Sequence, residues 1–152
     1  MNIQIINPTL YPHWDDLLIT NPETTFFHTA AWAKVLNESY GYTPLYFPLL
    51  GDGHLYGLIP TMEINSFLTG KRGVSLPFTD FCEPVAHDTD MFTLLFENVI
   101  NYGRKADWQT FQIRGGKAFL SKELAAARML VHSLSLCDNE DKVRRGFRES
   151  TN

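Results

Sequence analysis

The chain has little cysteine and no metal-binding pattern. Its two cysteines, Cys82 and Cys137, stand far apart and form no CxxC pair. Two isolated cysteines in a chain of this length are typical of free or buried thiols in a reducing compartment. The five histidines are also scattered, without an HExxH pair or a similar spacing. We therefore expect no bound metal ion.

Several other features that would define a class of protein are missing. The first residues lack the basic start and long apolar core of a signal peptide, and no run approaches the 18 or so apolar residues of a membrane span. Neither a GxSxG elbow nor a GxxxxGK[ST] loop occurs, which argues against a serine hydrolase and excludes a P-loop NTPase. A net charge of -4 gives no general attraction to nucleic acid or to a membrane. These absences favour a cytoplasmic protein.

What is present has the composition of a globular domain. The 152 residues are 44% hydrophobic and 13% aromatic, which is enough to build one well-packed core. The sequence contains no internal repeat and no stretch typical of an interdomain linker. We expect a single domain over residues 1–152.

Periodicity predicts helices and strands in mixed order. Trp32, Val35 and Leu36 are expected on the inner face of one helix, and Gly103 is expected to end another. Pro60 predicts an edge or a bulge within its strand. This order predicts an α/β or α+β fold with a mixed β-sheet flanked by helices. Helices are expected from Pro12 to the break at Asn21-Pro22, from a cap at Thr29 to Gly41, from Asp88 or Asp90 to Gly103, and onward from a cap at Asp138. Strands are expected at 3–6, 45–49, 54–64, 72–78, 108–113 and 129–136, with Gly51-Asp52-Gly53 forming a hairpin turn.

Residues 70–84 combine features that neither a plain strand nor a plain loop would have. Two glycines flank Lys71 and Arg72, Pro77 breaks an apolar stretch, and Thr79 and Asp80 follow among aromatic residues. A core strand would not carry a proline and a carboxylate in its middle, and a loop would carry fewer apolar side chains. We predict that a strand leaves the sheet here and offers polar groups at a site.

The polar residues of this region each have more than one interpretation. Residues 70–73 could bind an anion through backbone N–H groups, although a hairpin turn with solvated cations is favoured. Arg114 follows an apolar strand, where it is equally suited to bind a substrate phosphate or carboxylate and to pair with a structural carboxylate. Asp80 could act as a general base, bind a substrate amine, or form a turn through its side chain.

Four regions, read in order, resemble FemAB-like proteins, the peptidoglycan bridge-forming aminoacyltransferases and their acyltransferase relatives. Their order and spacing carry the resemblance, which covers nearly the whole chain. It implies the GNAT (acyl-CoA N-acyltransferase) fold, usually present as two lobes, of which this chain would be the N-terminal one. The regions are residues 26–32 (FFHTAAW), 39–44 (SYGYTP), 57–60 (GLIP) with 75–80 (SLPFTD), and 147–151 (FREST).

The resemblance implies attack of an amine on an activated acyl carbonyl. The donor would be aminoacyl-tRNA or acyl-CoA, held largely outside this chain, so we expect no cofactor in the chain itself. The acceptor would be a small molecule or a peptidoglycan precursor. Asp80 would orient or deprotonate the amine, and His28 would carry a proton. The expected substrate-binding residues are Thr79, Trp32, Lys34, Arg72 and Arg114; Lys34 is the nearest match to a lysine that some members use toward the diphosphate of a nucleotide sugar.

Other functions stay open. A non-catalytic binding module with a degenerate GNAT fold fits the same sequence, as does a self-contained CoA-dependent N-acetyltransferase. The acetyltransferase is disfavoured because no Q/R-x-x-G-x-G/A motif for the pyrophosphate lies between a strand and a helix. The last helix reaches Asn152 without a stop signal, so we expect a truncated lobe that is inactive alone. Association of identical chains is also open.

Overall fold

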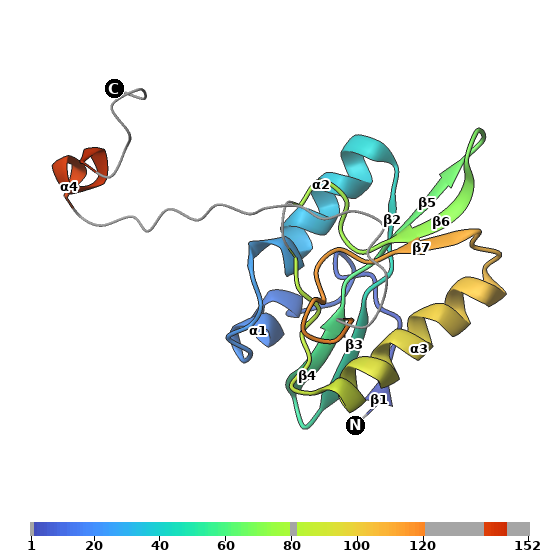
Figure 1. Cartoon of the computed structure of the whole chain (residues 1–152). Coiled ribbons are helices and arrows are strands. Elements are labelled where there is room, and N and C mark those ends of the chain that lie inside the picture. The colour runs from blue at the N-terminus through green and yellow to red at the C-terminus, as the bar shows by residue number, and fades with distance from the viewer. Residues whose placement is uncertain (1, 80–81, 121–138, 146–152) are drawn as a thin grey trace.

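The computed structural model describes residues 2–79, 82–120 and 139–145. Within these ranges the predicted α+β class is confirmed: helices flank two sheets, one of order β1-β3-β4 and one of order β2-β5-β6-β7 (Figure 1). The elements are β1 (Asn2–Ile3), α1 (Trp14–Ile19), the 3-10 helix η1 (Phe26–His28), α2 (Ala30–Tyr40), β2 (Thr43–Pro44), β3 (Phe47–Gly51), β4 (His54–Ile59), β5 (Met62–Ser66), β6 (Gly70–Val74), α3 (Thr89–Lys105), β7 (Thr110–Gln112) and α4 (Glu140–Arg144).

A long bent hairpin runs through both sheets. β3 pairs antiparallel with β4, and β2 pairs antiparallel with β5. The backbone N–H of Leu45 donates to the carbonyl of Thr61 at 2.8 Å, so the two halves stay paired where they bend. The predicted turn at residues 51–53 is confirmed, and so is the disruption at Pro60. The uninterrupted strand over 54–64 is wrong, because Pro60 and Thr61 separate β4 from β5.

Two hydrophobic cores lie on opposite sides of this hairpin. Tyr46 and Leu58 point toward α1 and α2, where Leu36 is buried against them. Their sequence neighbours Phe47 and Ile59 point the other way, into a core built with α3. Figure 1 shows α3 crossing one face while α1 and α2 lie on the other. Because successive side chains of a strand point to opposite faces, this one hairpin contributes to the hydrophobic core on each side of the sheet.

Helix α2 begins at the predicted cap but turns a different face inward. The Thr29 hydroxyl accepts a hydrogen bond from Trp32 N at 3.3 Å, and Gly41 ends the helix with a φ of 69°. Ala33 and Leu36 are fully buried, whereas Val35 is 45% exposed. The placement of Val35 on the inner face is therefore wrong, because the helix packs through positions 33 and 36.

Helix α3 continues past the residue that was expected to end it. Asp88 caps its N-terminus by accepting from Met91 N at 2.8 Å, as predicted, but the helix runs on to Lys105. Gly103 lies inside it, and a Cβ there would come within 2.6 Å of Trp108 Cε3. This glycine therefore serves close packing, because the Trp108 ring lies directly against the helix backbone.

Other boundaries also differ from the predictions. α1 begins at Trp14, two residues after Pro12. The strand predicted at 108–113 is shorter, as β7, and only its middle residue Phe111 is partly buried. Asn139 caps α4, while the expected cap Asp138 and the strand predicted at 129–136 lie outside the described residues. None of the helices in the described ranges is long and apolar enough to cross a membrane.

Substituting Gly103→Ala tests the packing of Trp108 on α3. Gly→Ala inside a helix normally stabilises by about 1 kcal/mol. Here we expect urea denaturation to show a loss of about 1–3 kcal/mol, because the new methyl group overlaps the indole. In a Trp108→Leu background the same change should become stabilising. A stabilising Gly103→Ala in the unmodified chain would contradict this packing.

Candidate functional site

The chain leaves the sheet after Val74 and returns at Val85. β5 and β6 pair antiparallel in a constant register, from Ser66↔Gly70 to Met62↔Val74. If this register continued by four more residues, Phe78 would lie opposite Leu58. Instead Leu58 exchanges two backbone hydrogen bonds with Val85, at 2.8 and 2.9 Å. The seven extra residues are accommodated in an excursion over residues 75–84. The predicted departure from the sheet is confirmed, and the strand predicted to reach Phe78 ends at Val74.

Pro60 lies opposite this excursion. The backbone N–H of Leu58 points toward Val85, and the carbonyl of Thr61 points the other way, toward Leu45. Because the backbone N–H and C=O groups of successive residues in a strand point to opposite sides, the nitrogen of Pro60 faces the side from which the excursion departs. Proline has no N–H to leave unpaired, so the absence of a strand partner there costs no hydrogen bond.

The start of the excursion holds two side chains in an unfavourable backbone conformation. Leu76 and Phe78 have φ values of 42° and 62°, in the left-handed region. Residues of this kind cost about 1–3 kcal/mol each and gather at functional sites. Leu76 points into the core with no exposed surface, whereas Phe78 is 55% exposed. The strained backbone on either side of Pro77 therefore turns Leu76 into the core and Phe78 toward the solvent.

Arg114 fastens this strained segment to the end of β7. The last regular bond between the strands runs from Ser75 N to the Gln112 carbonyl at 2.8 Å. Beyond it, Arg114 N donates to the Ser75 hydroxyl at 2.7 Å, and Arg114 Nη1 donates to the Thr79 carbonyl at 3.3 Å. Thr79 is buried, and its hydroxyl donates to the Leu76 carbonyl at 2.8 Å.

This arrangement brings together Thr79 and Arg114, two of the residues predicted to bind substrate. Among the described residues the Arg114 guanidinium contacts a backbone carbonyl and no carboxylate, so the pairing with a structural carboxylate is not seen there. Binding of a substrate phosphate or carboxylate by Arg114 stays a prediction. The regular pairing of the parallel strands β6 and β7 ends here, at Val74↔Gln112. Such an end of a parallel pair is where open α/β sheets place their ligands.

His28 holds the far end of the excursion. Its Nδ1 accepts from Thr25 N at 3.0 Å, so Nε2 carries the proton and donates to the Glu83 carbonyl at 3.2 Å. The ring has no exposed surface, and burial lowers its pKa although the hydrogen bond to the Glu83 carbonyl opposes that shift. The geometry gives His28 a structural role, and proton transfer by His28 stays a prediction that the geometry does not favour.

Cys82 and Glu83 complete this attachment. Cys82 Sγ lies 3.5 Å from His28 Nε2, and burial, together with the nearby Glu83 carboxylate, raises the pKa of the thiol to about 12. The thiol is therefore protonated at neutral pH and is a poor nucleophile. The Glu83 carboxylate accepts a hydrogen bond from Gly116 N. The excursion is thus fastened by Arg114 near its start and by His28 and Gly116 near its end.

An exposed stack of aromatic rings borders the excursion. This stack was not predicted from the sequence. Tyr40 at the end of α2 stacks on Phe78 with ring centroids 4.5 Å apart and on Tyr42 at 5.5 Å. Tyr40 and Phe78 each expose more than half of their side chains. Only the strained backbone of Phe78 brings its ring to Tyr40 and Tyr42.

Two further candidates, Trp32 and Lys34, lie on α2. Trp32 packs on Phe27, and its buried indole N–H has no acceptor among the described residues. Lys34 is exposed and pairs with Glu38 at 3.7 Å, a surface contact that contributes little. Asp80 lies outside the described residues.

Arg72 is placed by β6 rather than by a turn. Residues 70–73 belong to the regular β5–β6 ladder, so the hairpin turn expected there is wrong; the turn lies at 67–69. The Arg72 guanidinium donates to the Thr69 hydroxyl. Among the described residues, no three His, Cys, Asp or Glu side chains gather in a way that could hold a metal ion.

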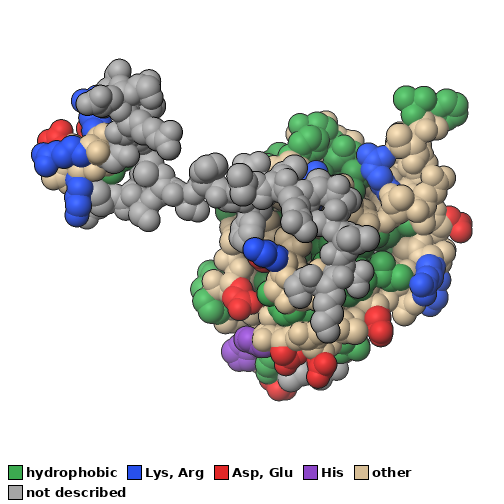
Figure 2. Space-filling view, in the orientation of Figure 1, with side chains coloured by type: hydrophobic (Ala, Val, Ile, Leu, Met, Phe, Trp, Pro, Cys, Tyr) green, Lys and Arg blue, Asp and Glu red, His purple; other side chains and the backbone are tan. Residues whose placement is uncertain are grey.

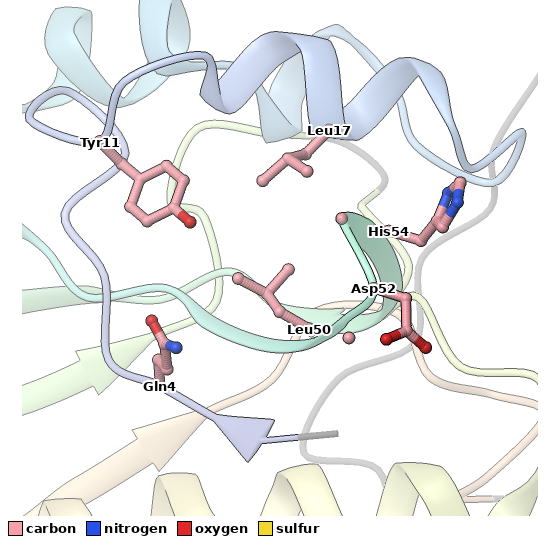
Figure 3. Close-up of a pocket in the computed structure, with 8 residues that line it drawn as sticks. Gln4, Tyr11, Leu17, Leu50, Asp52 and His54 are labelled. Carbon is pink, nitrogen blue, oxygen red and sulfur yellow. The ribbon is translucent and has the colours of Figure 1, made fainter.

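A separate hollow of about 260 Å³ lies at the β3–β4 hairpin (Figure 3). Tyr11 and Leu17 reach toward Leu50 from one side, while Asp52 and His54 border it at the turn. None of the residues predicted to bind substrate lines it. The excursion is therefore the better candidate site, because strain, buried polar contacts and the carboxyl end of a parallel strand pair meet there.

Comparisons with known proteins identify the fold. No family model and no curated protein matches the chain. A ribosomal-protein-alanine N-acetyltransferase from Brucella melitensis biovar Abortus 2308 matches with a TM-score of 0.54 and 14% identity, over 89% of this chain and 98% of that one. An aminoglycoside acetyltransferase from an uncultured soil metagenomic sample gives 0.57 and 17%, over 90% and 98%. An aminoglycoside 6'-N-acetyltransferase from Acinetobacter haemolyticus gives 0.56 and 11%, over 91% and 100%.

These likenesses show the fold alone, because the identities are low. The chain has the GNAT acetyltransferase fold, as the resemblance to FemAB-like proteins implied.

The burial of His28 predicts a pH-dependent stability. Its pKa is lowered in the folded chain, so the unfolded chain takes up the proton first as the pH falls below about 6.5. Stability from this group is full above that value and is lost below it, by at most about 1.4 kcal/mol per pH unit. Urea denaturation between pH 7.5 and 5.5 should show this slope. His28→Gln should flatten it, whereas the exposed His54→Gln should not; an unchanged slope in His28→Gln would contradict the burial.

The attachment by Ser75 predicts a second stability effect. Ser75→Ala removes the acceptor of Arg114 N, and we expect denaturation to show a loss of about 1–3 kcal/mol. Ser66→Ala is the matched control, because its hydroxyl accepts only from Thr69 N in an exposed turn. It should change stability by less than about 0.5 kcal/mol. Equal effects of the two substitutions would refute the attachment.

Proposed function

We propose that this chain takes part in the transfer of an acyl group to an amine and that the excursion forms the acceptor side of the site. The observation that carries the proposal is a GNAT fold in which the pairing of the parallel strands β6 and β7 ends where the excursion begins. The matched structures with this fold are named as acetyltransferases. The proposal assigns the same class of reaction to this chain.

Acyl transfer to an amine needs a neutral amine, a route for its proton and donors for the developing oxyanion. A strand that leaves its ladder turns backbone N–H groups away from the sheet, and such groups are suitable donors. Asp80 directly follows Thr79, whose carbonyl Arg114 holds. We propose Asp80 as the group that orients or deprotonates the amine.

The described residues fit the pyrophosphate of acyl-CoA poorly. A helix N-terminus binds phosphate when its N–H groups are free and no negative charge lies nearby. At α3 the Asp88 carboxylate occupies Met91 N, and Asp90 adds a second negative charge in the first turn. Residues 75–88 contain no glycine that would let the backbone approach a phosphate closely. We therefore propose an activated acyl ester or thioester as the donor.

The finer proposal is a FemAB-like lobe that accepts a peptidoglycan precursor, with aminoacyl-tRNA as the donor class. Its support is the convergence of three of the four segments that carry the resemblance. His28, from 26–32, holds the excursion through Glu83. Tyr40, from 39–44, stacks on Phe78. Leu58, from 57–60, pairs with Val85 where the excursion ends. The fourth segment, 147–151, lies outside the described residues.

A self-contained CoA-dependent N-acetyltransferase is the second candidate. Its support is the extent of the structural match, which covers 98–100% of the acetyltransferase chains described above. The acidic start of α3 argues against it.

A titration followed by amide NMR separates the two candidates. We expect a nucleotide-linked peptidoglycan precursor to shift the signals of residues 75–79 and 112–116, and acetyl-CoA to leave them in place. Arg114→Ala should weaken precursor binding at least tenfold, because the excursion loses its attachment. Arg104→Ala, an exposed arginine on α3, is the control. Shifts by acetyl-CoA alone would favour the second candidate, and no shift by either compound would contradict both.

A further inference from the structure

The hairpin that joins β5 to β6 ends in an exposed apolar tip. Phe67 is 104% exposed and Leu68 is 89% exposed, the two highest values among the large hydrophobic residues of the described ranges. Figures 1 and 2 show this hairpin projecting from the body of the molecule with hydrophobic side chains at its end. Exposed apolar residues gathered on a projecting element are typical of an interaction site.

The tip is held in place and has a positive charge beside it. Regular pairing continues up to Ser66↔Gly70, directly below the tip. Lys71 is neutralised by Glu63 at 3.2 Å. Arg72 makes no ion pair with any described residue, and its guanidinium bonds to Thr69, next to Leu68. The tip therefore presents two apolar side chains with one uncompensated cation.

A pocket of complementary character lies elsewhere on the same chain. Its volume is about 320 Å³. The apolar part of its wall comes from two segments: Pro84 and Ala86, where the excursion ends, and Ala118 and Phe119, which follow β7. Two glutamates add negative charge. Neither glutamate forms an ion pair within the described ranges. The lining residues are Glu23, Thr25, Glu83, Pro84, Ala86, Ala118 and Phe119.

We propose that the tip of one chain inserts into this pocket of a second copy. Phe67 would fill the apolar part against Phe119, and Arg72 would meet Glu23 and Glu83. Charge complementarity selects this occupant, because the uncompensated cation stands beside the tip and the uncompensated carboxylates stand at the pocket. The inference does not depend on the proposed enzymatic function.

The contact is weak and depends on concentration. One inserted tip buries less surface than the roughly 1,200 Å² of a stable interface. Every copy carries both a tip and a pocket, so two reciprocal contacts close a two-fold dimer, and a single contact leads to head-to-tail chains.

Sedimentation equilibrium of the whole chain over a wide concentration range tests the proposal. We expect the average mass to rise with concentration and this rise to weaken at high salt. Phe67→Ser with Leu68→Ser should weaken association at least tenfold, and Ala118→Trp should do the same by filling the pocket. Ile19→Ser with Leu10→Ser is the control, because both residues are highly exposed apolar residues elsewhere.

Two further measurements identify the contact itself. Arg72→Glu should weaken association, and adding Glu23→Arg to it should restore most of the loss. Mixing the tip variant with the pocket variant should restore association, because each supplies the half that the other lacks. A mass that stays monomeric at all concentrations would overturn the proposal. So would association that survives Ala118→Trp, or tip-dependent binding to anionic vesicles without self-association.

Discussion

Two backbone hydrogen bonds between Leu58 and Val85 determine the arrangement of the site. They bring the chain back to the sheet seven residues later than an unbroken β5–β6 ladder would allow. The intervening residues have to leave the sheet, and their departure imposes the left-handed backbone at Leu76 and Phe78. Without this late return, β6 would continue alongside β4 and no polar segment would project at its carboxyl end.

The rest of the structure stabilises that departure. Arg114 holds the start of the excursion and His28 holds its end, each through backbone carbonyls. Pro60 removes the N–H that would otherwise lack a partner opposite it. The cost of two strained residues, about 1–3 kcal/mol each, is offset by these contacts and by the burial of Leu76. A GNAT sandwich with a distorted central strand results, and acyl transfer to an amine is the function that we propose for it.

The fold class and the departure from the sheet could be predicted from the sequence because they depend on local composition. A proline and a carboxylate within an apolar stretch rule out a regular strand. The place of return could not be predicted, since Val85 looks like any strand residue until its partner is known. Gly103 was misread as a helix stop for the same reason: only the tertiary structure shows Trp108 against it. His28 appeared available for chemistry because burial, which lowers its pKa, is not visible in the sequence.

NMR measurement of the cross-strand contacts of Leu58 tests the central claim most directly. We expect nuclear Overhauser contacts between the backbones of Leu58 and Val85, with both amides protected from hydrogen exchange, because each donates to the other. Contacts between the backbones of Leu58 and Phe78 would show an uninterrupted ladder. That result would remove the excursion and, with it, the structural basis of the site.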